Sequence, residues 1–142
     1  MKPHKLLLGL GSNLGPTVEN LRRAIRLLDE RVGSVYRVST FVESEPLGFS
    51  SPNRFTNAVC MVHTHLSPLR CLRETQAIER EMGRTEKTQG LAYADRIIDI
   101  DLLMYDDIRI DSPELTLPHP RMSERPFVTE PLREILAEEN DL

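Results

Sequence analysis

The amino-acid sequence predicts an α+β domain in which helices pack on an antiparallel sheet. Segments with strand character and segments with helical spacing of apolar residues follow one another in the order β-α-β-β-α-β. The chain has 142 residues, of which 39% are hydrophobic and 28% charged, and this is typical of one globular domain with a buried core. We therefore expect a single domain over residues 1–142.

The first half of the pattern contains a strand, a helix and a second strand. The short apolar run at residues 5–11 predicts a strand buried on both faces. Apolar residues recur at helical spacing from Val18 to Val32, which predicts a helix with Thr17 as its N-cap and Gly33 at its end. The β-branched and aromatic residues that follow predict a strand over residues 35–44.

The second half repeats this order after a long loop at residues 45–53. Residues 54–66 predict the third strand, and Ser67 followed by Pro68 marks a helix that ends at Gly83. A second long loop at 84–95 leads into a fourth strand at 97–105, followed by a short strand near 108–110, an irregular segment at 117–121 and a helix over 131–138. The order is that of the ferredoxin-like βαββαβ fold, with the last helix on the other face and both loops beside the fourth strand.

The fourth strand carries two carboxylates that start the functional argument. Side chains in a strand alternate between its faces, so Asp99 and Asp101 share one face while Ile98, Ile100 and Leu102 share the other. Two carboxylates ~7 Å apart repel each other unless a cation or strong donors join them. Mg²⁺ bound by these carboxylates and by substrate phosphates would remove the repulsion, although two solvated Asp side chains explain the spacing equally well.

Basic residues gather in the segments on either side of these carboxylates, at Arg84, Lys87, Arg96, His119, Arg121 and Arg125. Such a set suits phosphoryl transfer, which depends on positioning and charge neutralisation more than on covalent chemistry. For Lys87 and Arg121 taken singly, a basic residue in a polar loop is the simpler interpretation. Arg96 immediately precedes the Asp-bearing strand and could bind a phosphate that the metal also holds.

Two further motifs give weaker signals. The glycine-rich turn at 9–15 is no dinucleotide fingerprint, because Leu14 stands where the third glycine belongs, and the chain has no P-loop motif. Asn13 in this turn is most simply a residue of the helix-entry turn. Phe55 and Asn57 share a strand face and could stack on and hydrogen-bond a flat heterocycle, although such a pair is equally ordinary in a core.

Composition argues against several classes of protein. A net charge of −4 and a pI near 5.6 argue against general binding to nucleic acid or to anionic membranes. No apolar run approaches the ~20 residues of a membrane span, so we expect a cytoplasmic protein without a membrane or nucleic-acid partner. Cys60 and Cys71 lack metal-ligand spacing and are expected to be reduced core residues.

Several motifs in unbroken order between residues 5 and 135 together resemble the hydroxymethyl-dihydropterin pyrophosphokinases of folate biosynthesis. The most specific part is Arg-x-x-Asp-x-Asp at 96–101 followed by Pro-His-Pro at 118–120. The other motifs are Gly11-Ser12-Asn13-Leu14-Gly15, Glu45-Pro46-Leu47-Gly48, Phe55-x-Asn57-Ala58, Gln76-x-x-Glu79 before Gly83-Arg84, and Arg125-x-Phe127.

The resemblance implies a ferredoxin-like transferase, a single pyrophosphokinase domain. It would transfer the β,γ-diphosphate of ATP to the hydroxymethyl group of 6-hydroxymethyl-7,8-dihydropterin and release AMP. The resemblance further implies that two Mg²⁺ ions are bound by Asp99 and Asp101, and that Glu79 helps to orient the site. The protein is expected to act as a monomer on these two substrates.

The remaining site residues are implied by position. The resemblance implies catalytic roles for Arg84, Arg96, Asp99 and Asp101. It implies ATP contacts from Gln76, Arg84, Arg96, Ile98, His119 and Arg125. It implies pterin contacts from Ser44, Leu47, Phe55, Asn57 and Phe127.

The sequence departs from the family pattern in its loops. The family often has a Trp in the second loop, but this chain has no Trp, so Leu91 or Tyr93 would have to close that loop. The first loop reads Ser44-Glu45-Pro46-Leu47 where the family often has Thr-Pro-Pro-Leu.

Two alternative functions share this topology. A non-catalytic ligand sensor leaves the Asp pair and arginines unexplained, and an RNA-binding RRM would require the RNP1 aromatic pattern, which the sequence lacks.

Overall fold

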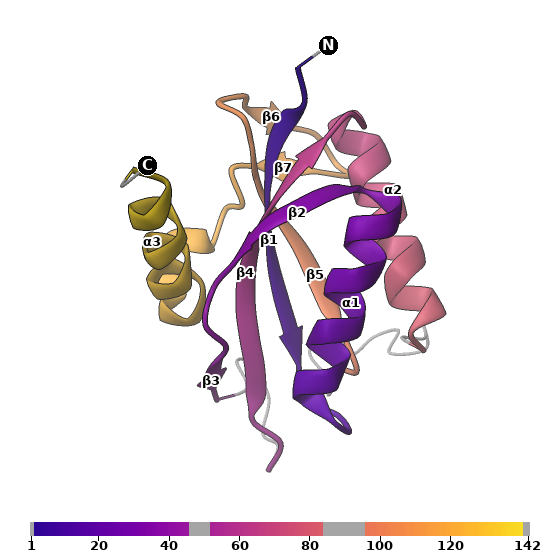
Figure 1. Ribbon diagram of the computed structural model, residues 1–142, viewed down its shortest axis with the longest axis vertical. Helices are drawn as coiled ribbons and strands as arrows, with labels where there is room; N and C mark the ends of the chain where they lie inside the picture. Colours follow the sequence, from indigo (N-terminus) through magenta and orange to yellow (C-terminus); the bar gives the residue numbers. More distant parts are fainter. Residues whose placement is uncertain (1, 46–51, 84–95, 141–142) are drawn as a thin grey trace.

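The computed structural model describes residues 2–45, 52–83 and 96–140, and the elements below lie within these ranges. In chain order they are β1 (His4–Ser12), α1 (Thr17–Arg31), β2 (Gly33–Val38), β3 (Val42–Ser44), β4 (Phe55–Thr64), α2 (Pro68–Glu81), β5 (Asp99–Tyr105), β6 (Ile110–Asp111), β7 (Thr116–Leu117), a 3₁₀ turn (Met122–Glu124) and α3 (Pro126–Asn140) (Figure 1).

The main sheet has the strand order β2-β4-β1-β5, and all of its pairs are antiparallel. The short strand β3 pairs with the start of β4. Helices α1 and α2 cover one face of the sheet and α3 covers the other (Figure 1). The predicted α+β class, the ferredoxin-like βαββαβ order and the helices on both faces are confirmed.

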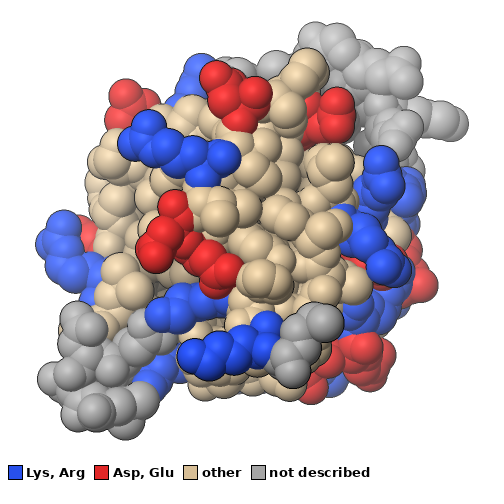
Figure 2. Space-filling model, turned by 90° about the horizontal axis from the view of Figure 1, so that it is seen from above, with Lys and Arg blue, Asp and Glu red and all other residues tan. Residues whose placement is uncertain are grey.

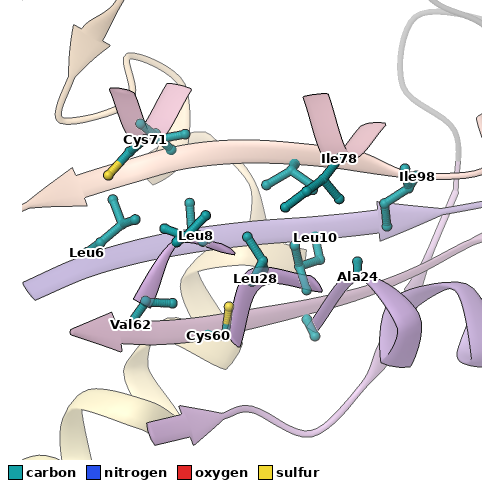
Figure 3. Packing of buried hydrophobic residues seen from close by; sticks show 14 of the residues in the cluster. Leu6, Leu8, Leu10, Ala24, Leu28, Cys60, Val62, Cys71, Ile78 and Ile98 are labelled. Carbon is teal, nitrogen blue, oxygen red and sulfur yellow. The ribbon is translucent and has the colours of Figure 1, made fainter. Parts of the chain in front are cut away.

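Two apolar cores lie on the two faces of the sheet, because side chains alternate along its strands. The helix-pair core, between the sheet and α1 and α2, includes Leu6, Leu8, Leu10, Leu28, Val62 and Ile78 (Figure 3). The α3 core includes Leu7, Val59, Met61, Leu103, Leu132 and Ile135.

The two cysteines lie in the helix-pair core as free thiols, as the sequence predicted. Their sulfur atoms are drawn in yellow in Figure 3. Burial raises the pKa of the Cys60 thiol to about 12 and also raises that of Cys71. Both side chains therefore behave as small apolar residues.

The start of α1 differs from the prediction. Pro16 occupies the N-cap and makes no side-chain capping bond, so the assignment of Thr17 as N-cap was wrong. The Thr17 hydroxyl is instead 2.8 Å from the Thr56 hydroxyl of β4 and ties the helix start to the sheet. The start of α2 agrees with the prediction, because the Ser67 hydroxyl accepts a hydrogen bond from the N–H of Arg70.

The strand predicted over residues 35–44 is divided into β2 and β3. Ser39 is buried between them, and its N–H donates to the carbonyl of Val59 while its hydroxyl accepts from the N–H of Val59. The Ser39 hydroxyl thus takes the place of a backbone carbonyl as the acceptor for Val59 of β4. The regular backbone pairing of β2 with β4 ends there. The strand also begins earlier, at Gly33, where a Cβ atom would overlap the carbonyl of His63.

The last helix begins at Pro126, five residues before the predicted start at Pro131. Pro126 stands at the first helical position, where proline is favoured, whereas Pro131 lies buried inside the helix. The prediction took the wrong proline as the start of the helix.

In the described part of the chain, no helix has the length and apolar character that a bilayer span requires.

Candidate active site

The candidate site lies where β1 ends and where β4 and β5 begin, at the lower end of the sheet in Figure 1. Gly11 of β1 pairs with Asn57 of β4 on one side and with Asp99 of β5 on the other. Ile98, Ile100 and Leu102 belong to the helix-pair core, whereas Leu103 belongs to the α3 core. Asp99 and Asp101 therefore share the α3 face, as strand alternation predicted.

Each carboxylate of the pair has an arginine beside it. Arg96 Nη1 is 3.2 Å from Asp99 Oδ1, and Arg125 Nη1 is 3.7 Å from Asp101 Oδ2. Desolvation and the charge of Asp99 nevertheless raise the pKa of Asp101 to about 7, although Arg125 opposes this. Burial therefore disfavours the ionised form of Asp101 despite Arg125, and an additional cation beside it would be favourable.

The chemistry of the donors fits Mg²⁺ bound together with a phosphate ligand. Among the residues the structure describes, no group of three or more His, Cys, Asp or Glu side chains is placed to hold a metal. A metal at Asp99 and Asp101 would need oxygen ligands from elsewhere. Mg²⁺ commonly binds in this manner, through one or two carboxylates, water and substrate phosphates.

Glu79 of α2 supports the strand between the two carboxylates. Its side chain is buried, and its Oε2 accepts a hydrogen bond of 2.7 Å from the N–H of Ile100, which lies between Asp99 and Asp101. Since β5 is the edge strand of the sheet, this bond satisfies a backbone donor that no further strand would pair. Glu79 thus fixes the backbone from which both carboxylates project.

His119 lies beside the same edge of the sheet. Its N–H donates to the carbonyl of Leu103, and its Nδ1 accepts from the N–H of Arg121 at 3.2 Å. Partial burial and the charges of Arg125 and Arg121 lower the pKa of His119, whereas Asp99 opposes this. The ring is therefore neutral at neutral pH, and its proton is on Nε2.

A cavity of about 270 Å³ opens next to His119. It lies between α2, β5 and the β6–β7 hairpin, and Asp101 and His119 contribute its polar side chains together with Glu114 and Thr116. Its remaining walls come from Leu72, Ile100, Leu102, Pro113, Leu115 and Pro120. The sequence analysis did not identify Leu72 of α2 or the hairpin residues 113–116 as site residues. They belong to no motif, and nothing in their spacing distinguishes them from other apolar and turn residues.

The structure also brings Ser44, Phe55 and Asn57 together. Asn57 is buried, and its Nδ2 donates to the Ser44 hydroxyl at 2.8 Å and to the Val42 carbonyl at 3.2 Å. These bonds orient the amide so that Oδ1 lies over Gly11, where a Cβ atom would be 3.2 Å from it and 3.4 Å from the Phe55 ring. A side chain at position 11 would therefore crowd the Asn57 amide and the Phe55 ring.

Phe127 lies in the first turn of α3 and packs against the α3 core. Its ring centre is 6.0 Å from the Arg125 guanidinium, which also approaches Asp101. Gln76 is exposed on α2, one turn before Glu79. Leu47, Arg84, Lys87, Leu91 and Tyr93, and with them most of the two long loops, lie outside the described residues.

The side chain of Ile98, a predicted nucleotide contact, lies in the interior, so a contact of Ile98 with a nucleotide would come from its backbone. The Ile98 side chain has no exposed surface and points into the helix-pair core (Figure 3). Ile100 and Leu102 of the same strand line the cavity beside His119 instead. Strand alternation already placed these three residues on the face opposite the carboxylates, and the structure shows which of them reach the cavity.

Fold and site together define a ferredoxin-like α+β protein with a candidate site for a metal-bound phosphate compound. The family model for 7,8-dihydro-6-hydroxymethylpterin-pyrophosphokinase (HPPK) matches residues 7–137. The chain belongs to the HPPK family.

Two bacterial relatives are named 2-amino-4-hydroxy-6-hydroxymethyldihydropteridine pyrophosphokinase. The protein from Porphyromonas gingivalis is 49% identical over 129 residues, which cover 90% of this chain and 88% of the relative. The protein from Bacillus subtilis is 38% identical over 129 residues, covering 90% of this chain and 75% of the relative.

Solved structures share the fold at low sequence identity. An HPPK-DHPS in complex with substrates superposes with a TM-score of 0.76 and 14% identity, and covers 95% of this chain. A Plasmodium falciparum HPPK-DHPS gives a TM-score of 0.72 at 17% identity over 93% of the chain. The chain spans 40% of the length of each of these two solved chains.

Proposed function

We propose that this protein transfers the diphosphate of ATP to the hydroxymethyl group of 6-hydroxymethyl-7,8-dihydropterin in folate biosynthesis. The observation that carries this proposal is the HPPK family match over residues 7–137, which contains every residue of the candidate site. The grouping of two carboxylates, two arginines and a neutral histidine supports it independently, because phosphoryl transfer requires charge neutralisation and positioning.

In the proposed site, the carboxylates of Asp99 and Asp101 would hold two Mg²⁺ ions. The raised pKa of Asp101 supports this assignment, because burial and the charge of Asp99 disfavour the ionised carboxylate and a cation would stabilise it. When bound, Mg²⁺ supplies neutralisation of the triphosphate charge. Glu79 contributes indirectly by holding the backbone between the two ligands.

We assign the phosphates of ATP to Arg96, Arg125 and His119, and by family resemblance to Arg84. The arginines lie beside the carboxylates and could bind the oxygens of a phosphate group there. His119 can donate from Nε2 while remaining neutral, because the N–H of Arg121 occupies Nδ1. Gln76 and the cavity beside His119 are proposed to receive the nucleoside.

The pterin is proposed to lie over Gly11, between Asn57 and the carboxylate pair. Phe55 and Phe127 would stack on its rings, and Asn57 and Ser44, with Leu47 by resemblance, would contact its edge. The hydroxymethyl oxygen then forms a bond to the β-phosphorus while the bond from that phosphorus to the bridging α–β oxygen breaks. AMP leaves, and the hydroxyl proton is released.

We further propose that the protein acts as a monomer in the cytoplasm. The large apolar side chains that are exposed in the described ranges are single residues on separate elements, such as Val18, Leu69 and Leu136. On the face in Figure 2, basic and acidic side chains are interspersed among uncharged residues. Light scattering of the purified protein should give a mass near 16.2 kDa, and a dimer mass would contradict the proposal.

The function is tested by incubating the protein with ATP, Mg²⁺ and hydroxymethyl-dihydropterin and separating the nucleotides by chromatography. AMP should form only when pterin and metal are both present. Formation of ADP instead would indicate an ordinary kinase. Pterin binding without nucleotide turnover would indicate a ligand sensor, and either of these results would overturn the proposal.

A further inference from the structure

Asn13 lies in the turn between β1 and α1 and is only 3% exposed, and its amide joins two distant segments. Its Oδ1 accepts a hydrogen bond of 2.6 Å from the N–H of Arg96. Its Nδ2 donates to the carbonyl of Asn53 at 3.2 Å. The backbone N–H of Asn13 donates to the carbonyl of Arg96 at 2.9 Å.

The turn does not need the side-chain bonds of Asn13 for its own stability, and these bonds serve to hold Arg96. The turn is supported by Asn20, whose Nδ2 is 3.1 Å from the Ser12 hydroxyl and 2.8 Å from the Leu14 carbonyl, and Pro16 is the N-cap of α1. Asn13 instead binds both the N–H and the carbonyl of Arg96. A helix-entry role therefore does not account for its side chain.

The position of the Arg96 backbone limits where its guanidinium can lie. Arg96 is three residues before Asp99, the first residue of β5, and its Nη1 is 3.2 Å from Asp99 Oδ1. The Arg96 side chain is 18% exposed. A shift of the Arg96 peptide would move a charged group that stands beside the candidate metal ligands.

We propose that Asn13 is a positioning residue that holds the Arg96 guanidinium beside Asp99. The proposal rests on the proposed function, in which Arg96 binds the phosphates of ATP. Asn13 acts through Arg96 and does not itself touch substrate. A buried amide that satisfies the backbone at the entry to β5 is suited to this role, because small displacements of a charged group have large effects on a reaction.

A double-mutant cycle between Asn13→Ala and Arg96→Ala tests this role. The measured quantity is the single-turnover rate of AMP formation with Mg²⁺ and both substrates saturating, so that product release does not mask the chemical step. In the otherwise wild-type protein, Asn13→Ala should lower this rate about tenfold or more. In the Arg96→Ala background, the same change should alter it by less than about twofold, because the two residues act as one unit.

Asn20→Ala is the matched control, since it removes the hydrogen bonds of the Asn20 side chain to Ser12 and Leu14 in this turn but does not remove a contact to Arg96. It should lower the urea midpoint of unfolding about as much as Asn13→Ala while keeping the rate within about twofold of wild type. Two results would overturn the positioning role: equal rate losses from Asn13→Ala in both backgrounds, or an equal rate loss in Asn20→Ala. Absence of AMP formation by the wild-type protein would instead overturn the proposed function, and this role with it.

Discussion

At the scale of single residues, the site depends on a position that has no side chain. Gly11 lies between Asn57 and Asp99 in the sheet, and we propose that the pterin binds over it. The neighbouring Asn57 amide is fixed by Ser44 and has little freedom to withdraw. The size of residue 11 therefore decides how much room the proposed pterin site has.

Gly11→Ala should weaken pterin binding because the new methyl group would be 3.2 Å from Asn57 Oδ1 and 3.4 Å from the Phe55 ring. We expect the KM for the pterin to rise by about tenfold or more while the KM for ATP stays nearly constant. Steady-state kinetics with each substrate varied in turn measures both constants.

Gly9→Ala is the control for this prediction, because the nearest atoms to its methyl group would be those of Leu103 at 3.6 Å, an ordinary contact distance. The control should keep the KM for the pterin within about twofold of wild type. Equal KM values for Gly11→Ala and wild type would show that the pterin does not bind over Gly11.

At the scale of elements, Asp106 joins the end of β5 to the start of β1. Its Oδ1 accepts from the N–H of Lys5 at 2.7 Å, its Oδ2 is 2.6 Å from His4 Nδ1, and its own N–H donates to the Lys5 carbonyl. Desolvation raises the pKa of Asp106, but the hydrogen bonds from Lys5 and His4 outweigh it and the net pKa is lowered. The ionised carboxylate therefore stabilises this joint.

Asp106→Asn should make the protein less stable at neutral pH but not in acid. A carboxyl group whose folded-state pKa is lowered stabilises the fold above its unfolded-state pKa, and this contribution is lost as pH falls through the folded-state pKa. Asn tolerates the left-handed backbone at this position, where φ is 48°, so the variant tests the charge. Urea unfolding from about pH 7 to about pH 2 should show the difference shrinking to zero, and a constant difference would contradict the account.

Helix α3 is the second element on which the site depends, because it carries Phe127 and closes the α3 core. Ile135 has no exposed surface and packs among residues such as Val59 and Leu132. We expect Ile135→Ala to lower the free energy of unfolding by about 2–5 kcal/mol. The neighbouring Leu136 is 36% exposed, so Leu136→Ala should cost less than about 1 kcal/mol in the same denaturation experiment. Similar losses in both variants would mean that α3 does not pack as described.

At the scale of the whole molecule, one antiparallel sheet separates two cores and gathers the candidate site at one of its ends. The carboxylates project from an edge strand whose other face lies in the helix-pair core. The arginines and His119 come from segments at the start of β5 and before α3. Ligand binding at this end should therefore stabilise the entire fold rather than one element.

A non-hydrolysable ATP analogue should raise the thermal unfolding midpoint only when Mg²⁺ is present. A ligand that binds the folded state stabilises it by RT ln(1 + [L]/Kd), which is about 2.7 kcal/mol at a concentration of 100 Kd. Differential scanning calorimetry with Mg²⁺, and with EDTA as the metal-free control, measures the shift. An equal shift in both conditions would argue against a metal-dependent nucleotide site.

Much of the fold could be predicted from the sequence because its elements have clear periodicity. The order of strands and helices and the shared face of Asp99 and Asp101 follow directly from residue spacing. The break at Ser39 could not be predicted, since it arises from bonds to Val59 on another strand. The early start of α3 was missed because two prolines, Pro126 and Pro131, each resemble a helix start.

The candidate site was predictable only in part for a similar reason. Its charged residues stand in recognisable motifs, whereas the roles of Asn13 and of the cavity residues depend on contacts between distant segments. The Ile98 side chain lies in the core, so the nucleotide contact that the family resemblance implies for Ile98 would have to come from its backbone. Motifs identified the chemistry, and tertiary contacts determined which side chains can take part in it.

The most direct test of the account is the rate of AMP formation by Asp99→Asn and Asp101→Asn compared with wild type. Both substitutions keep the shape of the side chain, and circular dichroism should show an unchanged fold. If the pair holds Mg²⁺ for diphosphate transfer, each variant should lose at least about a hundredfold in rate. Rates close to wild type in both variants would contradict the central claim that diphosphate transfer depends on these two carboxylates.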